Sequence, residues 1–455
     1  MFLPSGETLF WAAGRGELEN VKSQCRDPAA EINWQRESNG CSVFYAACEG
    51  GDVGVVGYLL SRGGVDPVLP AHDGTTPFFT ACQNGHTEVV SLLLADPRCD
   101  PEKPKNDGVT PFLCACFKAH REVVSLLLAD PRIDPNKEMN TGGFPLFVAC
   151  QKGNLEVVSL LLADPRVDSN KPMNKDATPF YVACQDGNRE MVSLLLSDPR
   201  IDPNKPRTDG ATPLIVASAN GHKEVVSLLL ADPRIDPDRG DHEGITPLLE
   251  ACCGGHKEVL SLLLADPRID PNRTENNGAT PFLLACGKGN REIVSLLLAD
   301  PKIDPNKLLN EGVTPFFVAC QEGHTEVVSL LLADPRIDPN KATKNQSTPL
   351  YQAAQQGRLA VIQLLLASDA EIDTRKRIIT EDPLENGKNA AEWARLLGTI
   401  QKPGYMTDED HERAKMVGPL CADLIEDYEK DPAKVRSRLR AAGGLPLSKI
   451  LQASA

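Results

Sequence analysis

The chain has 455 residues, of which 41% are apolar and only 5% aromatic, a composition that suits many small helical layers better than one large core. Its net charge of −15 argues against nucleic acid and anionic membranes as partners, because both require a basic face. The N-terminus lacks the basic and apolar regions of a signal peptide, and no apolar run approaches the ~18 residues that span a bilayer. We therefore predict a soluble, intracellular protein in the cytoplasm, with the nucleus as an alternative.

A Thr-Pro pair recurs along the chain at steps of 34 residues or twice 34. The pairs are Thr76-Pro77, Thr110-Pro111, Thr178-Pro179, Thr212-Pro213, Thr246-Pro247, Thr280-Pro281, Thr314-Pro315 and Thr348-Pro349. Phe144-Pro145 fills the one gap, and two further steps of 34 towards the N-terminus reach Val43 and Leu9. Eleven units in one register therefore cover roughly residues 5 to 380.

The first unit, residues 5–38, differs from those that follow. It contains Trp11 and Trp34 and has a more polar second helix at residues 17–24. This composition predicts an N-terminal capping repeat, whose outer face must remain in water. Ten stacked units are then expected over residues 39–380.

Each unit is expected to form two antiparallel helices, as residues 76–97 illustrate. Thr76 is a favourable N-cap, and Pro77 stands at the first helical position, where its missing N–H costs nothing. Asn84-Gly85 ends this helix, and a second, apolar helix begins near Glu88 and stops at Asp96-Pro97. One unit cannot bury its own apolar faces, so neighbouring units must stack.

The C-terminal region is predicted from weaker signals. Residues 381–400 are expected to form a degenerate capping half-repeat, displaced by about seven inserted residues around 375–384. Residues 401–455 are expected to form a helical extension, with an acidic helix at 407–430 and a short basic helix from Asp431-Pro432 to Gly443-Gly444. The extension is expected either to fold on the last repeat or to serve as an independent docking motif.

Residues 210–230 carry the pattern G-x-T-P-L-x-x-A followed by G-H-x-E-V-V-x-L-L-L. In this pattern the chain resembles the ankyrin family, and the resemblance covers over four-fifths of the chain. It implies an all-α fold with short β-hairpin loops, in which about 11–12 helix-turn-helix units stack into a curved solenoid. It also implies that partner proteins bind on the concave side.

Several residues depart from the family pattern. The family's histidine after T-P-L is replaced by apolar side chains such as Phe79 and Tyr351, so we expect apolar packing in place of a polar network between repeats. Phe144 replaces a threonine cap, at an expected local cost of about 1 kcal/mol. Asp176 and Gln346 replace the hairpin glycine, and we expect a distorted turn near Gln346, since glutamine takes positive φ reluctantly.

Cysteines recur in one column of the repeat. The column contains Cys48, Cys82, Cys116, Cys150, Cys184, Cys252, Cys286 and Cys320, with Ser218 and Ala354 in equivalent places. Equivalent positions in stacked helices lie roughly 8–10 Å apart, too far for a disulfide. We interpret these cysteines as small buried residues and predict no metal site, since Cys114-Ala115-Cys116 and Cys252-Cys253 lack zinc-ligand spacing.

Histidines form a second column, which follows the glycine between the two helices. Its members are His86, His120, His222, His256 and His324, and asparagine stands there in Asn154, Asn188 and Asn290. A hydrogen bond within the turn explains both residue types. We predict neither catalysis nor a cofactor, because no nucleophile recurs beside these histidines.

The sequence Asp-Pro-Arg-Ile-Asp also recurs, for instance over residues 130–134 and 232–236. We interpret it as a solvated turn whose local charge pairing contributes little, with a charged ribbon that steers a partner as the alternative. Asparagines follow the Ile-Asp-Pro sequence and are expected to be structural, although in ankyrin relatives such asparagines are sometimes hydroxylated. They are Asn136, Asn204, Asn272, Asn306 and Asn340.

The resemblance places the partner surface on hairpin tips and on exposed positions of the first helices. The residues carried over to these helix positions are Gln83, Asn84, Phe117, Lys118, Gln151, Lys152, Gln185, Asp186, Gln321, Glu322 and Gln355. Phe117 is the one clear aromatic anchor, and Met139, Met173 and Leu309 at hairpin tips are further apolar candidates.

The predicted function is a non-enzymatic scaffold or adaptor that acts as a monomer and binds partner proteins, with no nucleic acid and no membrane involved. Two alternatives remain open at this point. In the first alternative the chain is a regulatory subunit whose C-terminal tail is the effector part. In the second it is a purely structural, elastic solenoid. An enzyme is the least favoured class, because no catalytic constellation recurs.

Overall fold

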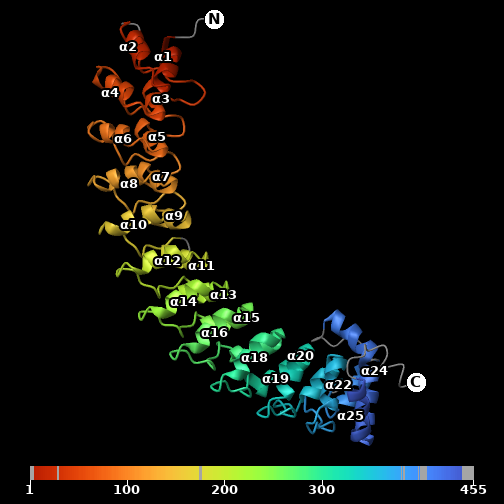
Figure 1. Cartoon of the computed structure of the whole chain (residues 1–455). Helices are drawn as coiled ribbons and strands as arrows, with labels where there is room; N and C mark the ends of the chain where they lie inside the picture. Colours follow the sequence, from red (N-terminus) through yellow and green to blue (C-terminus); the bar gives the residue numbers. More distant parts are fainter. Residues whose placement is uncertain are drawn as a thin grey trace. The chain divides into compact units, whose positions relative to one another are not determined.

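We describe a computed structural model of the chain over residues 5–27, 30–173, 177–380, 382, 385–397, 399 and 407–442 (Figure 1). The chain divides into two compact units, residues 1–209 and residues 210–455. The described residues are helical apart from turns and one isolated β-bridge between Gln35 and Ser42.

Residues 1–209 contain six helix pairs among their described residues. The pairs are α1 (Ser5–Gly14) with α2 (Leu18–Cys25), α3 (Val43–Gly50) with α4 (Val53–Ser61), α5 (Pro77–Asn84) with α6 (Thr87–Leu94), α7 (Pro111–Lys118) with α8 (Arg121–Leu128), α9 (Pro145–Gln151) with α10 (Leu155–Ala163), and α11 (Pro179–Gln185) with α12 (Arg189–Leu196).

Residues 210–455 contain five further pairs and three final helices in their described part. The pairs are α13 (Pro213–Ala219) with α14 (Lys223–Ala231), α15 (Pro247–Gly254) with α16 (Lys257–Ala265), α17 (Pro281–Lys288) with α18 (Arg291–Ala299), α19 (Pro315–Glu322) with α20 (Thr325–Leu332), and α21 (Pro349–Gln355) with α22 (Leu359–Ala367). A 3-10 turn, η2 (Asn310–Gly312), precedes α19, and α23 (Ala390–Leu397), α24 (Asp408–Lys430) and α25 (Pro432–Ala441) follow the last pair.

The Thr-Pro pairs start the first helices as predicted. In α5 the Thr76 hydroxyl accepts a hydrogen bond from the Phe79 N–H at 3.1 Å, and Pro77 stands at the first helical position. Ser42 gives α3 an equivalent cap by accepting from the Tyr45 N–H at 3.0 Å. A hydroxyl cap satisfies one of the backbone donors that a helix leaves unpaired, so the cap and the proline together fix where each repeat begins.

Within each unit of the chain, helices pack in two layers. First helices contact the first helices of neighbouring repeats, and second helices contact second helices. In α6 the apolar face of Val89, Val90 and Leu93 is completely buried. Phe79 and Tyr351 are also buried, so the predicted apolar packing at the position of the family's histidine is confirmed.

The recurring histidine joins repeats rather than closing its own turn, so the predicted hydrogen bond within the turn is wrong. The Nε2 atom of His120 lies 2.8 Å from the Gln83 carbonyl oxygen of the preceding repeat, and His256 makes the same contact with Ala219 at 2.8 Å. Arg358 takes over this role by donating from Nε to the Gln321 carbonyl at 2.8 Å. These bonds satisfy carbonyls at the ends of first helices and link neighbouring repeats.

The asparagines of this column divide between two roles. Asn154 Nδ2 donates to the Cys116 carbonyl of the preceding repeat at 3.2 Å, whereas Asn188 and Asn290 cap their own second helices. Gly85 must lack a side chain because a Cβ atom there would lie 2.6 Å from Nδ1 of His120. Ala119 adopts the same left-handed conformation, with φ of 61°, where the next repeat carries the smaller Asn154.

Replacing His120 with alanine is therefore expected to destabilise residues 1–209 by about 1–2 kcal/mol, because the Gln83 carbonyl loses its partner. His120→Asn is expected to recover part of this loss, as Asn154 reaches a carbonyl of the preceding repeat. Urea denaturation of the three proteins measures the difference. Equal unfolding midpoints would show that the bond between repeats contributes nothing.

The Asp-Pro-Arg turn is exposed to solvent and pairs its own charges, as interpreted from the sequence, but it is also a second link between repeats. Arg166 forms a fork with the Asp164 carboxylate, at 3.1 Å from Nε and 2.6 Å from Nη2. The same guanidinium donates to the carbonyls of Ile133 at 3.2 Å and Leu128 at 2.5 Å in the preceding repeat. Leu128 ends α8, so Arg166 satisfies a carbonyl that the helix itself leaves unpaired.

The hairpin asparagines form a third link, which agrees with their predicted structural role. Asn136 donates from Nδ2 to the Arg166 carbonyl of the next repeat at 2.7 Å, and its Oδ1 accepts from the Asp168 N–H at 2.8 Å. Asn340 makes the equivalent pair of bonds to Glu371 and Asp373 at 2.5 and 2.8 Å. Both ends of each amide are thus used within the stack.

The hairpin loops are present as turns, and apart from the single bridge no β-strand occurs in the described residues. Lys105 donates to the Val109 carbonyl within one turn at 3.1 Å, and Asn106 donates to the Asp73 carbonyl of the preceding turn at 2.9 Å. The distorted turn predicted near Gln346 is not found. Gln346 takes a φ of 65°, and the turn still closes from the Thr343 N–H to the Ser347 carbonyl at 3.0 Å. Asp176 lies outside the described residues.

Phe144 lacks a side-chain cap bond, as predicted for the loss of threonine. Its ring is fully buried and packs on Phe147 with 5.8 Å between ring centroids, while Lys171 Nζ lies 5.4 Å from the Phe144 ring centroid. Burial of the ring offsets the missing cap.

The final helices fold onto the last repeat, which agrees with the first of the two expectations for the extension. Helix α24 packs against α21, α22 and α23, and α25 packs against α22 and α24. From α25, Arg440 Nε donates to the Ala367 carbonyl at the end of α22 at 2.8 Å, and Arg436 donates to the Ala370 carbonyl at 3.1 Å. These arginines replace the guanidinium link that a following repeat would supply. No described helix combines the length and apolarity needed to cross a bilayer.

Candidate functional site

The candidate site in residues 1–209 is the row of residues at the C-terminal ends of α5, α7, α9 and α11. Gln83 is half-buried, and the other members are exposed: Asn84, Phe117, Lys118, Gln151, Lys152, Gln185 and Asp186. Asn84 Nδ2 also donates to the Glu49 carbonyl at 3.3 Å, so its amide is partly engaged within the stack. The structure places these residues where the repeat register predicted exposed positions.

Phe117 and two lysines form an exposed cluster, which we call the Phe117 cluster and define as Phe117, Lys118 and Lys152. Phe117 is 41% exposed. Lys152 Nζ lies 4.6 Å from the ring centroid and Lys118 Nζ lies 5.9 Å from it. Both distances allow cation–π attraction. Neither ammonium forms an ion pair with a residue in the described ranges, so both charges remain available to an acidic group from outside.

Sequence reasoning predicted the three residues individually and missed their arrangement. Lys152 follows Phe117 by 35 residues, one repeat and one position further along. Because stacked repeats place equivalent positions side by side, this offset was the available signal for the contact.

In residues 210–455 the predicted surface is less regular. Gln321 is half-buried and Glu322 is exposed, and Gln321 Nε2 donates to Glu322 Oε1 at 2.9 Å. Gln355 is only 7% exposed and donates from Nε2 to Glu385 Oε1 at 2.9 Å. The prediction that Gln355 belongs to the exposed surface is therefore wrong. Glu385, which directly follows the inserted residues, covers this position.

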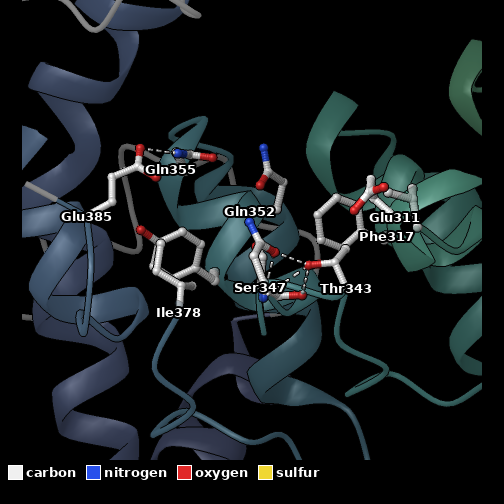
Figure 2. A pocket seen from close by; sticks show the side chains of 11 residues that line it. Glu311, Phe317, Thr343, Ser347, Gln352, Gln355, Ile378 and Glu385 are labelled. Carbon is white, nitrogen blue, oxygen red and sulfur yellow. Dashed lines mark hydrogen bonds between the residues drawn. The ribbon is translucent and has the colours of Figure 1, made fainter. Parts of the chain in front are cut away.

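A pocket with a volume of about 340 Å³ lies beside Gln355 (Figure 2). Hairpin residues on one side include Glu311, Thr343 and Ser347, and the first helices contribute Phe317, Tyr351 and Gln352. Ile378 of the inserted segment and Glu385, which directly follows it, complete the lining. Sequence reasoning missed this site, because the inserted residues have no counterpart in the other repeats.

The cysteines contribute to the core rather than to a reactive site. All fourteen are free thiols, and thirteen of them are buried, Cys253 being the exposed one. Burial raises the pKa of Cys99 and Cys114 to about 11 and that of Cys421 to about 12. Desolvation, followed by the charge of Glu250, also raises the pKa of Cys253. A raised pKa disfavours the thiolate that nucleophilic catalysis and metal ligation use.

Comparisons with known proteins place these repeats in a family. The family model described as ankyrin repeats (3 copies) matches residues 9–104, 53–139, 95–172, 112–207, 146–241, 233–308 and 302–376. One similar solved structure is the ankyrin repeat domain of Bcl-3, described as a unique member of the IkappaB protein family. It has 24% identity and a TM-score of 0.46, and the match covers 50% of this chain and 99% of that one. None of the curated proteins that were compared matches the chain. The overlapping family matches extend from residue 9 to residue 376, so the chain belongs to the ankyrin-repeat family.

Proposed function

We propose that this chain is a non-enzymatic scaffold that binds a partner protein through the Phe117 cluster and the neighbouring first-helix ends. Ankyrin repeats generally mediate protein–protein interaction. The observation that carries the proposal is the exposed Phe117 ring between two lysines from successive repeats. Aromatic rings that combine apolar area with adjacent charge dominate many interfaces, whereas the surrounding amides contribute mainly complementarity.

The chemistry of the cluster suggests a partner segment with an apolar side chain beside a carboxylate. The apolar side chain would cover the Phe117 ring, and the carboxylate would pair with Lys118 or Lys152. Gln83, Asn84, Gln151, Gln185 and Asp186 would form the polar rim in residues 1–209, and Gln321 and Glu322 remain candidates in residues 210–455. We also propose that the protein acts in the cytoplasm, since fourteen free thiols suit a reducing compartment, and that it acts as a monomer.

The Phe117→Ala, Lys152→Ala double variant is expected to reduce partner recovery at least ~10-fold, because hot-spot residues typically contribute more than ~1 kcal/mol each. The measurement is affinity isolation of the tagged full chain from its native cells, followed by quantitative mass spectrometry. The fold should survive, because both side chains are exposed.

Ser125→Ala is the matched control, since Ser125 is exposed on α8 of the same repeat and lies away from the cluster's helix ends. It is expected to recover partners as the unmodified chain does. A double variant that recovered every partner at the unmodified level would refute the role of the cluster. Circular dichroism of each variant separates loss of binding from loss of fold.

A further inference from the structure

The pocket beside Gln355 differs chemically from the rest of the repeat surface. Two carboxylates face it from different parts of the chain, Glu311 at a hairpin tip and Glu385 directly after the inserted segment. In Figure 2 they lie towards opposite ends of the pocket, with Gln352 between them. The residues that line the pocket include no lysine, arginine or histidine. The formal charge of the walls is therefore negative only, and the amides of Asn345, Gln352 and Gln355 add neutral polar groups.

The remaining walls add rings and hydroxyls. Phe317 and Tyr351 contribute aromatic rings, and Ser347 contributes a hydroxyl, whereas the Thr343 hydroxyl is already hydrogen-bonded to Asn345 and Ser347. Ser347 is only 5% exposed, and its Oγ has no hydrogen-bond partner among the described residues. A buried hydroxyl without a partner is unfavourable, so a donor group entering the pocket would gain a bond that the protein alone does not make.

From these walls we infer that the pocket binds the guanidinium side chain of an arginine presented by a partner polypeptide. A guanidinium offers five donors in one plane and no acceptor, which matches the two carboxylates and the Ser347 hydroxyl oxygen. Its flat faces stack on aromatic rings, such as those of Phe317 and Tyr351. This inference rests on the proposed function, because it takes the arginine to belong to a bound protein.

Other occupants fit the pocket less well. An anion would meet two carboxylates and no cationic side chain among the lining residues. A metal ion requires ligands that converge, and no cluster of three or more histidine, cysteine, aspartate or glutamate side chains in the described ranges could hold one. Lys344 Nζ lies 3.3 Å from Glu311 Oε1, but both side chains are more than 70% exposed, so an incoming guanidinium can displace this pair.

The inserted segment makes the pocket particular to this end of the chain. Ile378 donates from its N–H to the Lys388 carbonyl at 3.1 Å. Ile379 donates from its N–H to the Asn345 carbonyl at 2.8 Å, which fixes Ile379 beside the preceding hairpin. The bond from Gln355 then holds Glu385 in the wall. A buried carboxylate held by an amide is already in place before a ligand binds, which lowers the ordering cost of binding.

Titration of the full chain with N-acetyl-arginine amide, followed by saturation-transfer difference NMR, tests the inference. Saturable binding in the ~mM range is expected for so small a ligand. N-acetyl-citrulline amide has nearly the same shape without the charge and is expected to bind at least ~5-fold more weakly. Equal binding of the two compounds, or no saturable signal from the arginine compound, would overturn the inference.

The Glu311→Gln and Glu385→Gln variants are each expected to weaken binding of the arginine compound about 3–10-fold. The glutamine at position 385 can still accept from Gln355, and Glu311 is 73% exposed, so both variants should fold. Glu326→Gln, which removes an exposed carboxylate in the first turn of α20 outside the pocket lining, is the control and should bind as the unmodified chain does. Unchanged binding by both pocket variants would contradict the inference.

The two proposals fail separately. The Phe117→Ala, Lys152→Ala variant should bind the arginine compound normally, since the Phe117 cluster shares no residue with the pocket. Partner capture that depends on Phe117, together with no binding of the arginine compound, would reject the pocket alone. Partner capture that does not depend on Phe117, together with saturable binding of the arginine compound, would reject the Phe117 cluster and support the pocket.

Discussion

Replacing Trp393 with alanine is expected to destabilise the C-terminal helices by about 3–5 kcal/mol, the largest effect of any single substitution considered. Trp393 lies in α23 and is only 1% exposed, and α23 is the helix against which α24 packs most extensively. Alanine would leave a cavity at this junction. The expected result is early opening of α23, α24 and α25 while the preceding repeats remain folded.

Hydrogen exchange followed by mass spectrometry measures this opening directly, because stacked repeats need not unfold in one step. Trp393→Phe is the matched control. The Trp393 Nε1 atom has no hydrogen-bond partner among the described residues, so phenylalanine loses volume but no bond. It should cost less than about 1.5 kcal/mol. If exchange in α24 were the same in the alanine variant and the unmodified chain, the final helices would not depend on this contact.

Replacing Arg166 with alanine is expected to destabilise residues 1–209 by about 2–3 kcal/mol at neutral pH. The change removes the fork to Asp164 and the two carbonyl contacts with the preceding repeat. Hydrogen bonds to charged groups contribute about 1.5–3 kcal/mol each, and partial exposure of Arg166 reduces the sum. Arg121→Ala, at the exposed start of α8, is the control and should change stability by less than about 0.5 kcal/mol.

The same link predicts a dependence on pH. Hydrogen bonds from the Arg166 guanidinium hold the pKa of Asp164 below its ordinary value of 3.8. A carboxyl whose pKa is lowered by folding stabilises the fold above its unfolded pKa, and this contribution is lost as the pH falls through the folded value. Arginine lowers the pKa in the same way at Asp96, Asp130, Asp232, Asp266 and Asp334.

The contribution of these turns to the free energy of unfolding should therefore be constant from neutral pH down to about pH 4. At lower pH this contribution should decrease. Arg166→Ala removes one such contribution, so the difference between this variant and the unmodified chain should narrow in acid. Denaturant midpoints at pH 7, 5 and 3 measure both trends. A difference that stayed constant between pH 5 and pH 3 would show that the Asp164 charge is not coupled to folding.

The helices of each repeat were predicted well because capping and helix-stop signals act between residues a few positions apart. The bond from the Phe79 N–H to Thr76 spans three positions, so the sequence of one repeat is enough to place it. The contact between His120 and Gln83 spans 37 positions and depends on how two repeats stack. A single repeat shows that histidine is preferred there, but not which carbonyl it reaches.

The exposed residues of the candidate site were predictable where the 34-residue repeat continues without interruption. They were not predictable next to the insertion, where the repeat is interrupted. Phe117 and Lys152 occupy neighbouring columns of neighbouring repeats, so periodicity alone placed both on the surface. Gln355 was assigned by the same periodicity, but the segment inserted beyond it brings Glu385 over the amide. The path of an inserted loop depends on tertiary contacts such as that of Ile379 with Asn345, which no repeat pattern encodes.

Helices α24 and α25 have a consequence for self-association. The open end of a repeat stack presents the same apolar side chains that each repeat buries against its neighbour, and it can accept a repeat from another molecule head to tail. Contacts of this heterologous kind do not close on themselves and lead to filaments. Here α24 occupies the space beside α21, α22 and α23, and Arg440 already binds the carbonyl at the end of α22. Addition of another repeat at this face would first require displacement of α24 and α25.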